Sequence, residues 1–221
     1  MNIIKTTIFL AALILLNACT TVSVDEMRWQ ETSLDFTKDS VVILGRHHSP
    51  EYETEPELVS CIGSRLRSNI RGLNVIPEDD FVDLLYPWFE PRTAPLTMEK
   101  FIQVLDEPLI RDELERHGIR YMVWVEGATE TINQIGSMSC AIGPGGGGCF
   151  GFGSWENQSE YEASIWDFEN TREAGRISTD AQGTSYMPAI VIPIPLIARV
   201  QSNACDGMGT QLSAFLAPEA S

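Results

Sequence analysis

The pattern of apolar and polar residues predicts two strands that are buried on both faces. VVILG, residues 41–45, is a short β-branched run that ends in glycine, which is typical of a buried strand. IRYMVWVEG, residues 119–127, is apolar at odd and even positions alike. Because successive side chains of a strand point to opposite faces, the second run indicates a central strand of a sheet.

Three segments have the period of a helix. Residues 57–70 carry apolar side chains every four residues, and Gly72 ends the segment. In residues 97–117, Thr97 is placed as an N-cap and Pro108 as a first helical residue, which indicates two helices or one kinked helix before Gly118. A last helix is expected to start near Leu196 and to keep its apolar period as far as Phe215.

The remaining strands are predicted from alternation. Residues 158–168 alternate apolar and polar side chains, which is typical of a half-buried antiparallel strand. A turn at 170–175 and a second strand at 176–185 complete a hairpin, and residues 73–81 are expected to form a strand before the central one. Pro193 and Pro195 exclude a central strand interior after the hairpin.

This order of elements, β-α-β-α-β-β-β-α, predicts the fold class. We expect an α+β (α/β) fold with a single mixed sheet and helices on one face, formed as one domain over residues 40–217. Residues 20–39 are polar without a sustained period and are predicted to be a tether. Trp29 is a candidate to dock on the domain, although a lone tryptophan does not decide this.

The N-terminus resembles that of a bacterial lipoprotein. Lys5 precedes an apolar run from Ile8 to Leu16, which is too short to span a bilayer and is typical of a signal peptide, residues 1–18. The sequence Leu16-Asn17-Ala18-Cys19 is similar to a lipobox, and Thr20 rather than Asp follows. The resemblance implies a lipidated (palmitate-carrying) Cys19, an outer-membrane location on the periplasmic side, and anchoring by lipid rather than by a helix.

The net charge of the chain limits the classes of molecule that it is expected to bind. The 221 residues contain 15 basic and 31 acidic residues, a formal net charge of −16. Loss of residues 1–18 removes Lys5 and no acid, so the processed chain carries 14 basic and 31 acidic residues, or −17. A chain this acidic repels nucleic acid and anionic lipid headgroups, so we expect neither as a general partner.

Cysteine usage predicts disulfides. Without Cys19, four cysteines remain in an oxidising compartment, which allows three pairings. We favour Cys140–Cys149, which closes a glycine-rich stretch, and Cys61–Cys205, which joins an early helix to the last one. No C-x-x-C pair supports a metal site in their place, and adjacent His47 and His48 are expected to lie in a solvated loop. We predict no metal and no cofactor.

The stretch CAIGPGGGGCFGFGSW, Cys140 to Trp155, contains seven glycines in sixteen residues. It lacks the Lys and Ser/Thr of a phosphate-binding loop, and no capped helix follows it. We interpret it as a disulfide-closed surface loop. Its aromatic residues either contact a partner or fold back on the core: Phe150, Phe152 and Trp155.

The order of elements is similar to that of a known group of periplasmic lipoprotein domains. The similar parts are the VVILG strand, the RYMVWVEG strand preceded by a helix and Gly118, and the strand YEASIWDF with the later Gly183. Together they resemble the curli-secretion and penicillin-binding-protein-activator lipoproteins, which share a fold with the N-terminal domain of the Tol-system propeller protein. The resemblance implies a mixed sheet that binds protein partners or oligomerises, without catalysis.

These observations favour a non-enzymatic, outer-membrane-anchored lipoprotein that binds another envelope protein. Aromatic residues dominate interface energies, so two regions are contact candidates: Phe150, Phe152 and Trp155, and Tyr86, Trp88 and Phe89. The alternative is a subunit of a homo-oligomeric export channel to which each copy donates strands. A hydrolase is disfavoured because no G-x-S-x-G or H-E-x-x-H motif occurs, and Asp167 either is a buried acid or ends its strand in solvent. We nominate no catalytic residue.

Overall fold

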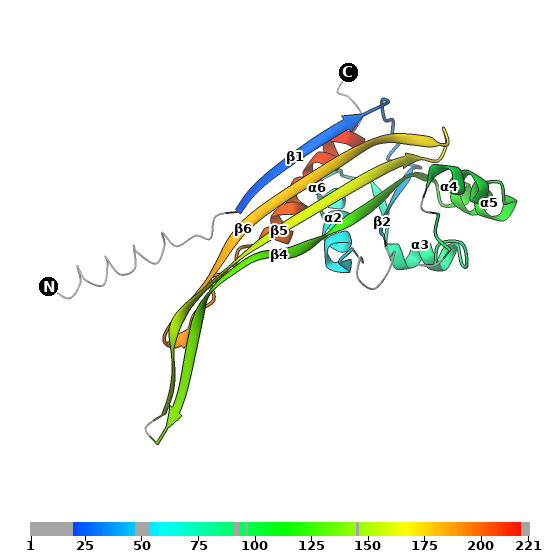
Figure 1. Ribbon diagram of the computed structural model, residues 1–221. Helices are drawn as coiled ribbons and strands as arrows, with labels where there is room; N and C mark the ends of the chain where they lie inside the picture. The colour runs from blue at the N-terminus through cyan, green and yellow to red at the C-terminus, as the bar shows by residue number, and fades with distance from the viewer. Residues whose placement is uncertain (1–19, 47–53, 91–92, 96, 145, 218–221) are drawn as a thin grey trace. The chain divides into compact units, whose positions relative to one another are not determined.

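The computed structural model describes residues 20–46, 54–90, 93–95, 97–144 and 146–217 (Figure 1). The predicted signal peptide, Cys19, His47 and His48 lie outside these ranges. The described elements are β1 (Thr20–Arg28), β2 (Ser40–Gly45), α2 (Pro56–Asn69), β3 (Asn74–Ile76), α3 (Glu78–Leu84), α4 (Met98–Leu105), α5 (Pro108–Arg116), β4 (Ile119–Gly143), β5 (Gly146–Asp167), β6 (Arg172–Pro193) and α6 (Val200–Leu216). Among the described residues, no helix is both long enough and apolar enough to cross a membrane.

The strands form one mixed sheet in the order β1-β6-β5-β4-β2-β3. β2 pairs in parallel with β3 on one side and with β4 on the other. β4, β5 and β6 are neighbours in both the chain and the sheet and are joined by short turns, so they run antiparallel. The predicted α+β class with a single mixed sheet is confirmed.

Helices cover both faces of the core strands, rather than one face as expected. Val42 and Leu44 of β2 belong to an apolar cluster that includes Phe81 of α3, Phe101 of α4 and Leu114 of α5. Ile43 points the other way, toward α2, where a Cβ added to Gly63 would lie 3.9 Å from its Cδ1. Every residue of β2 is buried. A strand that is apolar on both faces needs cover on both.

An extra residue interrupts the pairing of β2 with β4. Ser40 pairs with Ile119, but Val41 pairs with Tyr121, so Arg120 has no counterpart on β2. Such a β-bulge re-aims the side chain of the extra residue. Here it accompanies a buried arginine at the start of the central strand.

The predicted tether is wrong for its first nine residues, because Thr20–Arg28 is the edge strand β1. Beyond its end, the backbone N–H of Trp29 donates to the carbonyl of Ala174 at 3.0 Å. Val22 and Val24 reach toward α6, since a Cβ added to Gly207 would lie 3.2 and 3.0 Å from their methyl groups. The alternation of these two valines was the available signal.

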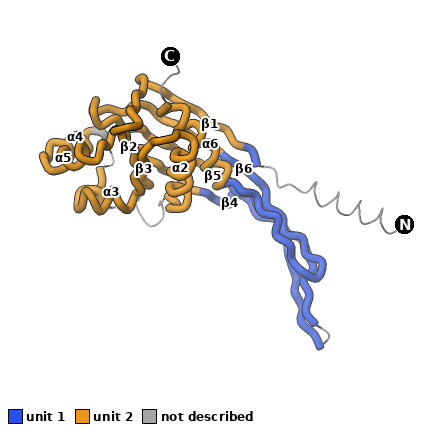
Figure 2. Tube along the Cα trace, turned by 180° about the vertical axis from the view of Figure 1, so that it is seen from behind, with its two compact units in different colours: residues 1–21, 129–158, 181–200 blue, residues 22–128, 159–180, 201–221 orange. Residues whose placement is uncertain are grey.

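The chain divides into two compact units (Figure 2). Of the described residues, unit 1 holds 20–21, 129–158 and 181–200, and unit 2 holds 22–128, 159–180 and 201–217. β4, β5 and β6 each contribute residues to both units. All of the apolar cluster on β2 belongs to unit 2.

Three local predictions differ from the structure. The glycine-rich stretch is not a loop, because β4 runs to Gly143 and β5 starts at Gly146. Residues 78–84 form α3, so only Asn74–Ile76 of the predicted strand is a strand. β6 continues to Pro193, and α6 begins at Val200 rather than near Leu196. In the first and third cases hydrogen bonding to a neighbouring strand outweighed the local propensity of glycine or proline. In the second case Pro77 is the N-cap of α3, so the strand ends before it.

Candidate protein-interaction surface

The most unusual surface of the molecule is a part of unit 1 without charge. Residues 131–155, which we name the uncharged hairpin, contain no Asp, Glu, Lys, Arg or His, and neither do residues 181–198. Charged residues make up 21% of the whole chain. The two segments therefore concentrate neutral surface in unit 1 and leave most of the acidic residues to unit 2.

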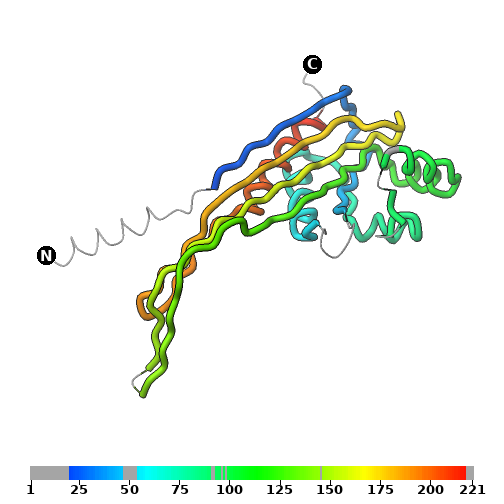
Figure 3. The backbone as a smooth tube through the Cα atoms, in the orientation of Figure 1, coloured from blue at the N-terminus to red at the C-terminus, as the bar shows by residue number. Residues whose placement is uncertain are grey.

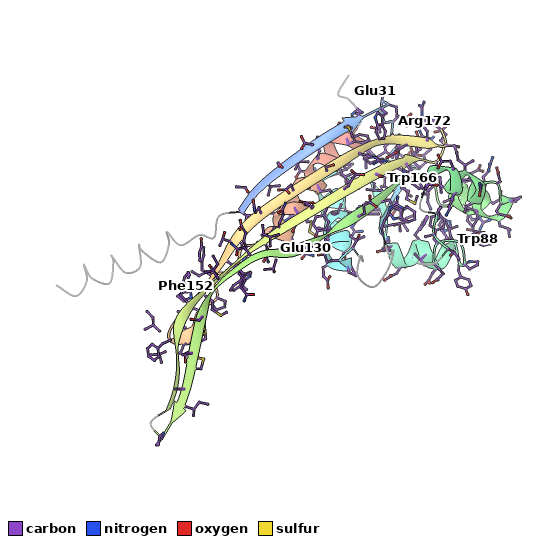
Figure 4. The ribbon with its side chains drawn as sticks, viewed as in Figure 1. Glu31, Trp88, Glu130, Phe152, Trp166 and Arg172 are labelled. Carbon is purple, nitrogen blue, oxygen red and sulfur yellow. A yellow bond between two sulfur atoms is a disulfide. The ribbon has the colours of Figure 1, made fainter. Side chains whose placement is uncertain are left out.

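Large apolar side chains are exposed on this neutral surface. Ile142 is 94% exposed and Phe150 61%. Further exposed apolar residues in unit 1 are Ile132, Ile135, Phe152, Tyr186, Ile190, Val191, Ile192, Ile194 and Ile197. Figure 4 shows side chains projecting from both sides of the paired strands, with Phe152 labelled. Exposed apolar residues of this kind make the surface a candidate for interaction.

Glycine and a disulfide allow the two strands of the hairpin to pair closely. A Cβ added to Gly136 would lie 2.2 Å from the carbonyl oxygen of Phe152, and one added to Gly151 would lie 2.3 Å from that of Ser137. Cys140 and Cys149 form the predicted disulfide, with their Cα atoms 4.0 Å apart. Gly136 and Gly151 thus permit a close approach of the two strands that a side chain would prevent.

The three predicted contact residues of this stretch differ in exposure. Phe150 and Phe152 are exposed, and the ring of Phe152 lies 6.1 Å from that of Tyr186, centroid to centroid. Trp155 is half-buried. The structure therefore brings Phe152 together with Tyr186, which sequence reasoning missed, and leaves Phe150 open to solvent.

The second predicted aromatic region does not form one surface. Tyr86 is exposed, and Trp88 is half-buried against the apolar cluster. Phe89 is 3% exposed, with its ring centroid 4.8 Å from that of Phe81 in an edge-to-face arrangement. The prediction that Phe89 contacts a partner is wrong, because its ring fills the core between α3 and the sheet.

The two edges of the sheet in unit 1 are not equivalent. After Pro193 the chain turns back along β6 (Figure 3), and Tyr186 and Leu196 exchange both backbone hydrogen bonds, at 2.9 and 2.7 Å. The N–H of Ala198 also donates to Ser185 Oγ at 3.0 Å. On the opposite edge, β2 pairs with β4 only at residues 119–125. Within the described ranges, no strand lies beside residues 130–143 on the side away from β5.

The buried charges of unit 2 have structural roles. Asp167 is 1% exposed, and its Oδ1 lies 3.0 Å from Arg120 Nη1, so it is a buried, paired acid. Asn170 and Gln30 donate to Asp167 Oδ2 at 2.7 and 3.3 Å. Glu169 also pairs with Arg120. The Asp167 carboxylate is therefore held by one ion pair and by two amide donors.

A second buried cation stacks on tryptophan. The Arg46 guanidinium carbon lies 4.7 Å from the centroid of Trp124, and its Nε lies 3.1 Å from Glu126 Oε2. Burial lowers the pKa of the Arg46 guanidinium, and the charge of Glu126 opposes that shift. The pairing and the stacking hold the side chain against the sheet.

No cofactor or metal site stands out among the described residues. Cys61, Cys205 and Asp206 are close together, but both sulfur atoms belong to the second predicted disulfide, which is confirmed. A cavity of about 360 Å³ is lined by equal numbers of basic and acidic side chains and so selects no ligand charge: Lys38, Arg111 and Arg120, and Asp39, Glu115 and Glu169.

Comparison with known proteins identifies no family. No protein-family model and no curated protein matches the chain. A PelC dodecamer from Paraburkholderia phytofirmans is 14% identical with a TM-score of 0.42, covering 90% of this chain and 100% of that one. A dodecamer of a PelC variant from the same organism is 14% identical with a TM-score of 0.41, and the match covers 89% of this chain and 99% of that one. Below a TM-score of 0.5, this similarity assigns neither a family nor a function to the chain.

Proposed function

We propose that this protein is a non-enzymatic lipoprotein, anchored to the outer membrane through Cys19, that binds another envelope protein through the uncharged hairpin. The observation that carries the proposal is the neutral surface of residues 131–155, on which isoleucine and phenylalanine side chains are exposed. The described buried acids and bases are paired within unit 2, which supports a binding role rather than catalysis.

Physical chemistry favours this surface over the rest of the molecule. A partner that covers Phe150 or Ile142 removes large apolar area from water, at about 25 cal/mol per Å². It also desolvates few charges, because the flanking Glu130 and Glu156 lie outside the uncharged hairpin. Tyr86 alone remains exposed in the second aromatic region, which makes that region the weaker candidate.

The test is photo-crosslinking in intact cells with a photoreactive amino acid at single positions of the full chain. Probes in place of Phe150 and Phe152 are expected to give one discrete adduct with an envelope protein. A probe in place of Trp29, an aromatic residue of unit 2 that is 52% exposed, is the matched control and is expected to give none. Equal adducts from all three positions would contradict a binding surface on the hairpin.

Anchoring is tested separately. A Cys19→Ser form is expected to leave the outer-membrane fraction, while its probe at Phe152 can still react. If Cys19→Ser leaves fractionation unchanged, the proposed lipid anchor is wrong and the binding proposal stands on its own.

The alternative function, a subunit of a homo-oligomeric export channel, draws on the length of the strands. β4 has 25 residues and β5 has 22, and both enter the uncharged hairpin. This alternative predicts a ladder of self-adducts that stops at a fixed size. A single adduct with a different protein would favour the binding function instead.

A further inference from the structure

We propose that the outer edge of β4, residues 130–143, pairs with the same edge of a second copy of this chain. This inference goes beyond the proposed function, because it assigns the outer edge of β4 to a second copy of the chain, whereas the proposed function concerns the binding of another envelope protein. The two edges of the sheet in unit 1 differ in whether another segment pairs with them. Leu196 hydrogen-bonds to the edge of β6 at Tyr186, whereas no described strand lies beside 130–143.

The geometry of the hairpin shows which backbone groups point outward. In antiparallel pairs, Cα atoms about 4.5 Å apart belong to non-hydrogen-bonded pairs, whose N–H and C=O groups point away from each other. Cys140 and Cys149 form such a pair, with 4.0 Å between Cα atoms. The N–H and C=O of Cys140 therefore point to the open edge. By alternation, those of Met138 and Ile142 point there as well.

This edge lacks two of the features by which proteins prevent strand addition. Edge strands are usually shortened, bent, or protected by lysine, proline or an inward charge. Residues 130–143 contain no proline and no lysine, and their one charged residue is Glu130 at the end. The β6 edge, in contrast, is followed by Pro193 and Pro195 and covered by the returning chain. One edge is protected and the other is open.

Symmetry and charge favour a second copy as the occupant. Antiparallel pairing of one segment with itself about a two-fold axis matches its donors with its own acceptors, so the edge is self-complementary. Pairing of β4 with β6 of another copy is blocked by the returning chain. Chains with a net charge of −16 repel each other. The uncharged hairpin is the surface at which that repulsion is smallest.

The pairing would also bury apolar residues. Ile132, Ile135 and Ile142 are exposed along β4. A neighbouring antiparallel strand brings side chains on one face to within about 5 Å of each other. The same isoleucines of the second copy are suitable neighbours, and the arrangement widens a sheet that is exposed on both sides.

The test uses two full-length copies with different C-terminal tags, expressed together in intact cells. A photoreactive residue in place of Ile142 is expected to give a two-copy adduct that carries both tags. Met138→Pro removes an outward N–H and places the proline ring at the open edge, while the hydrogen bonds between β4 and β5 remain. It is expected to lower the yield of the two-tag adduct at least tenfold. Met138→Ala, the matched control, shortens the same side chain and is expected to keep the yield within about twofold.

Each outcome decides the inference. Unchanged two-tag adduct with Met138→Pro, in a chain that still forms the Cys140–Cys149 disulfide, would overturn edge pairing. If Met138→Pro chains lack that disulfide, a bulky charged substitution, Ile142→Lys, replaces Met138→Pro in the test. The photoreactive residue then stands in place of Ile135. An adduct with a different protein and none with both tags would overturn self-pairing and leave the proposed function intact. No adduct from Ile142, Phe150 or Phe152 would overturn both.

Discussion

Tyr121 is a buried phenol whose ionisation is linked to stability. Its side chain is fully buried. Its hydroxyl oxygen accepts a hydrogen bond from the N–H of Ser33 at 3.1 Å, and its O–H donates to the carbonyl of Ser33 at 3.4 Å. Burial raises the pKa of Tyr121 above the ordinary value of 10.0 for a tyrosine. Because the folded pKa is the higher one, this group stabilises the fold fully below pH 10 and loses that contribution as pH rises through the raised pKa.

Tyr121→Phe is therefore expected to move alkaline unfolding to higher pH, while it costs about 1 kcal/mol near neutrality for the lost hydrogen bond. The measurement is far-ultraviolet circular dichroism between about pH 9 and 12. Tyr86→Phe, at an exposed ring, is the control and should leave the alkaline midpoint unchanged. An alkaline midpoint that stays the same in Tyr121→Phe would show that another group governs the transition.

Arg120 is the cation that the β-bulge places beside the buried Asp167. Arg120→Ala leaves the hydrogen bonds from Asn170 and Gln30 to Asp167 but removes its buried positive partner. We expect the free energy of unfolding to fall by about 3 kcal/mol, as for other half-removed buried pairs. Urea unfolding measures the loss, and Arg120→Ala combined with Asp167→Asn should recover part of it. No recovery in the double variant would mean that packing, not the unpaired charge, sets the cost.

Among the elements, β6 approaches both β1 and α6 closely at Gly175. A Cβ at this position would lie 2.4 Å from the carbonyl oxygen of Met27 and 2.7 Å from the ring of Phe215. Gly175→Ala is expected to lower the free energy of unfolding by about 1–3 kcal/mol, since both contacts must shift. Gly153→Ala is the control, because nothing lies within 4 Å of its added Cβ. Equal unfolding midpoints for the two variants would contradict the close approach.

The two disulfides act on different elements. Cys61–Cys205 joins α2 to α6 across a sequence separation of 144 residues. Cys140–Cys149 closes a loop between residues that are only 9 apart in the sequence. From loop-closure entropy, removal of Cys61–Cys205 should lower the free energy of unfolding by up to about 5 kcal/mol. Removal of Cys140–Cys149 should lower it by up to about 3 kcal/mol. We expect Cys61→Ser with Cys205→Ser to lower protection from hydrogen exchange throughout unit 2. Cys140→Ser with Cys149→Ser should lower it only in the hairpin, and a loss of protection in α2 would contradict this separation.

For the whole molecule, the separation of charge predicts how association depends on salt. The uncharged hairpin can form no ion pairs of its own, whereas the rest of the chain is strongly acidic. Salt shortens the screening length from about 30 Å at 0.01 M to about 3 Å at 1 M. Self-association through the hairpin is therefore expected to rise with salt, measured as the yield of the two-tag adduct from detergent-solubilised membranes. A yield that falls with salt would indicate an interface built on ion pairs.

The sequence by itself determined the α+β class and the two strands buried on both faces, and it favoured the cysteine pairing that the structure has. These follow from short-range periods and from counting: β2 and the first part of β4 are apolar on both faces, and Cys140 and Cys149 are near neighbours in the chain. The absence of charge from residues 131–155 is equally visible in the sequence. It is the signal that could have identified the hairpin surface.

The tertiary structure alone decided which polar or glycine-rich segments become strands and which aromatic rings are exposed. Thr20–Arg28 and Gly146–Gly148 have weak strand propensity and become strands because a neighbouring strand supplies their hydrogen-bond partners. Phe89 and Phe150 look alike in sequence, yet one fills the core beside Phe81 and the other lies in solvent. Partners distant in the chain set both outcomes, and the local pattern carries no information about them.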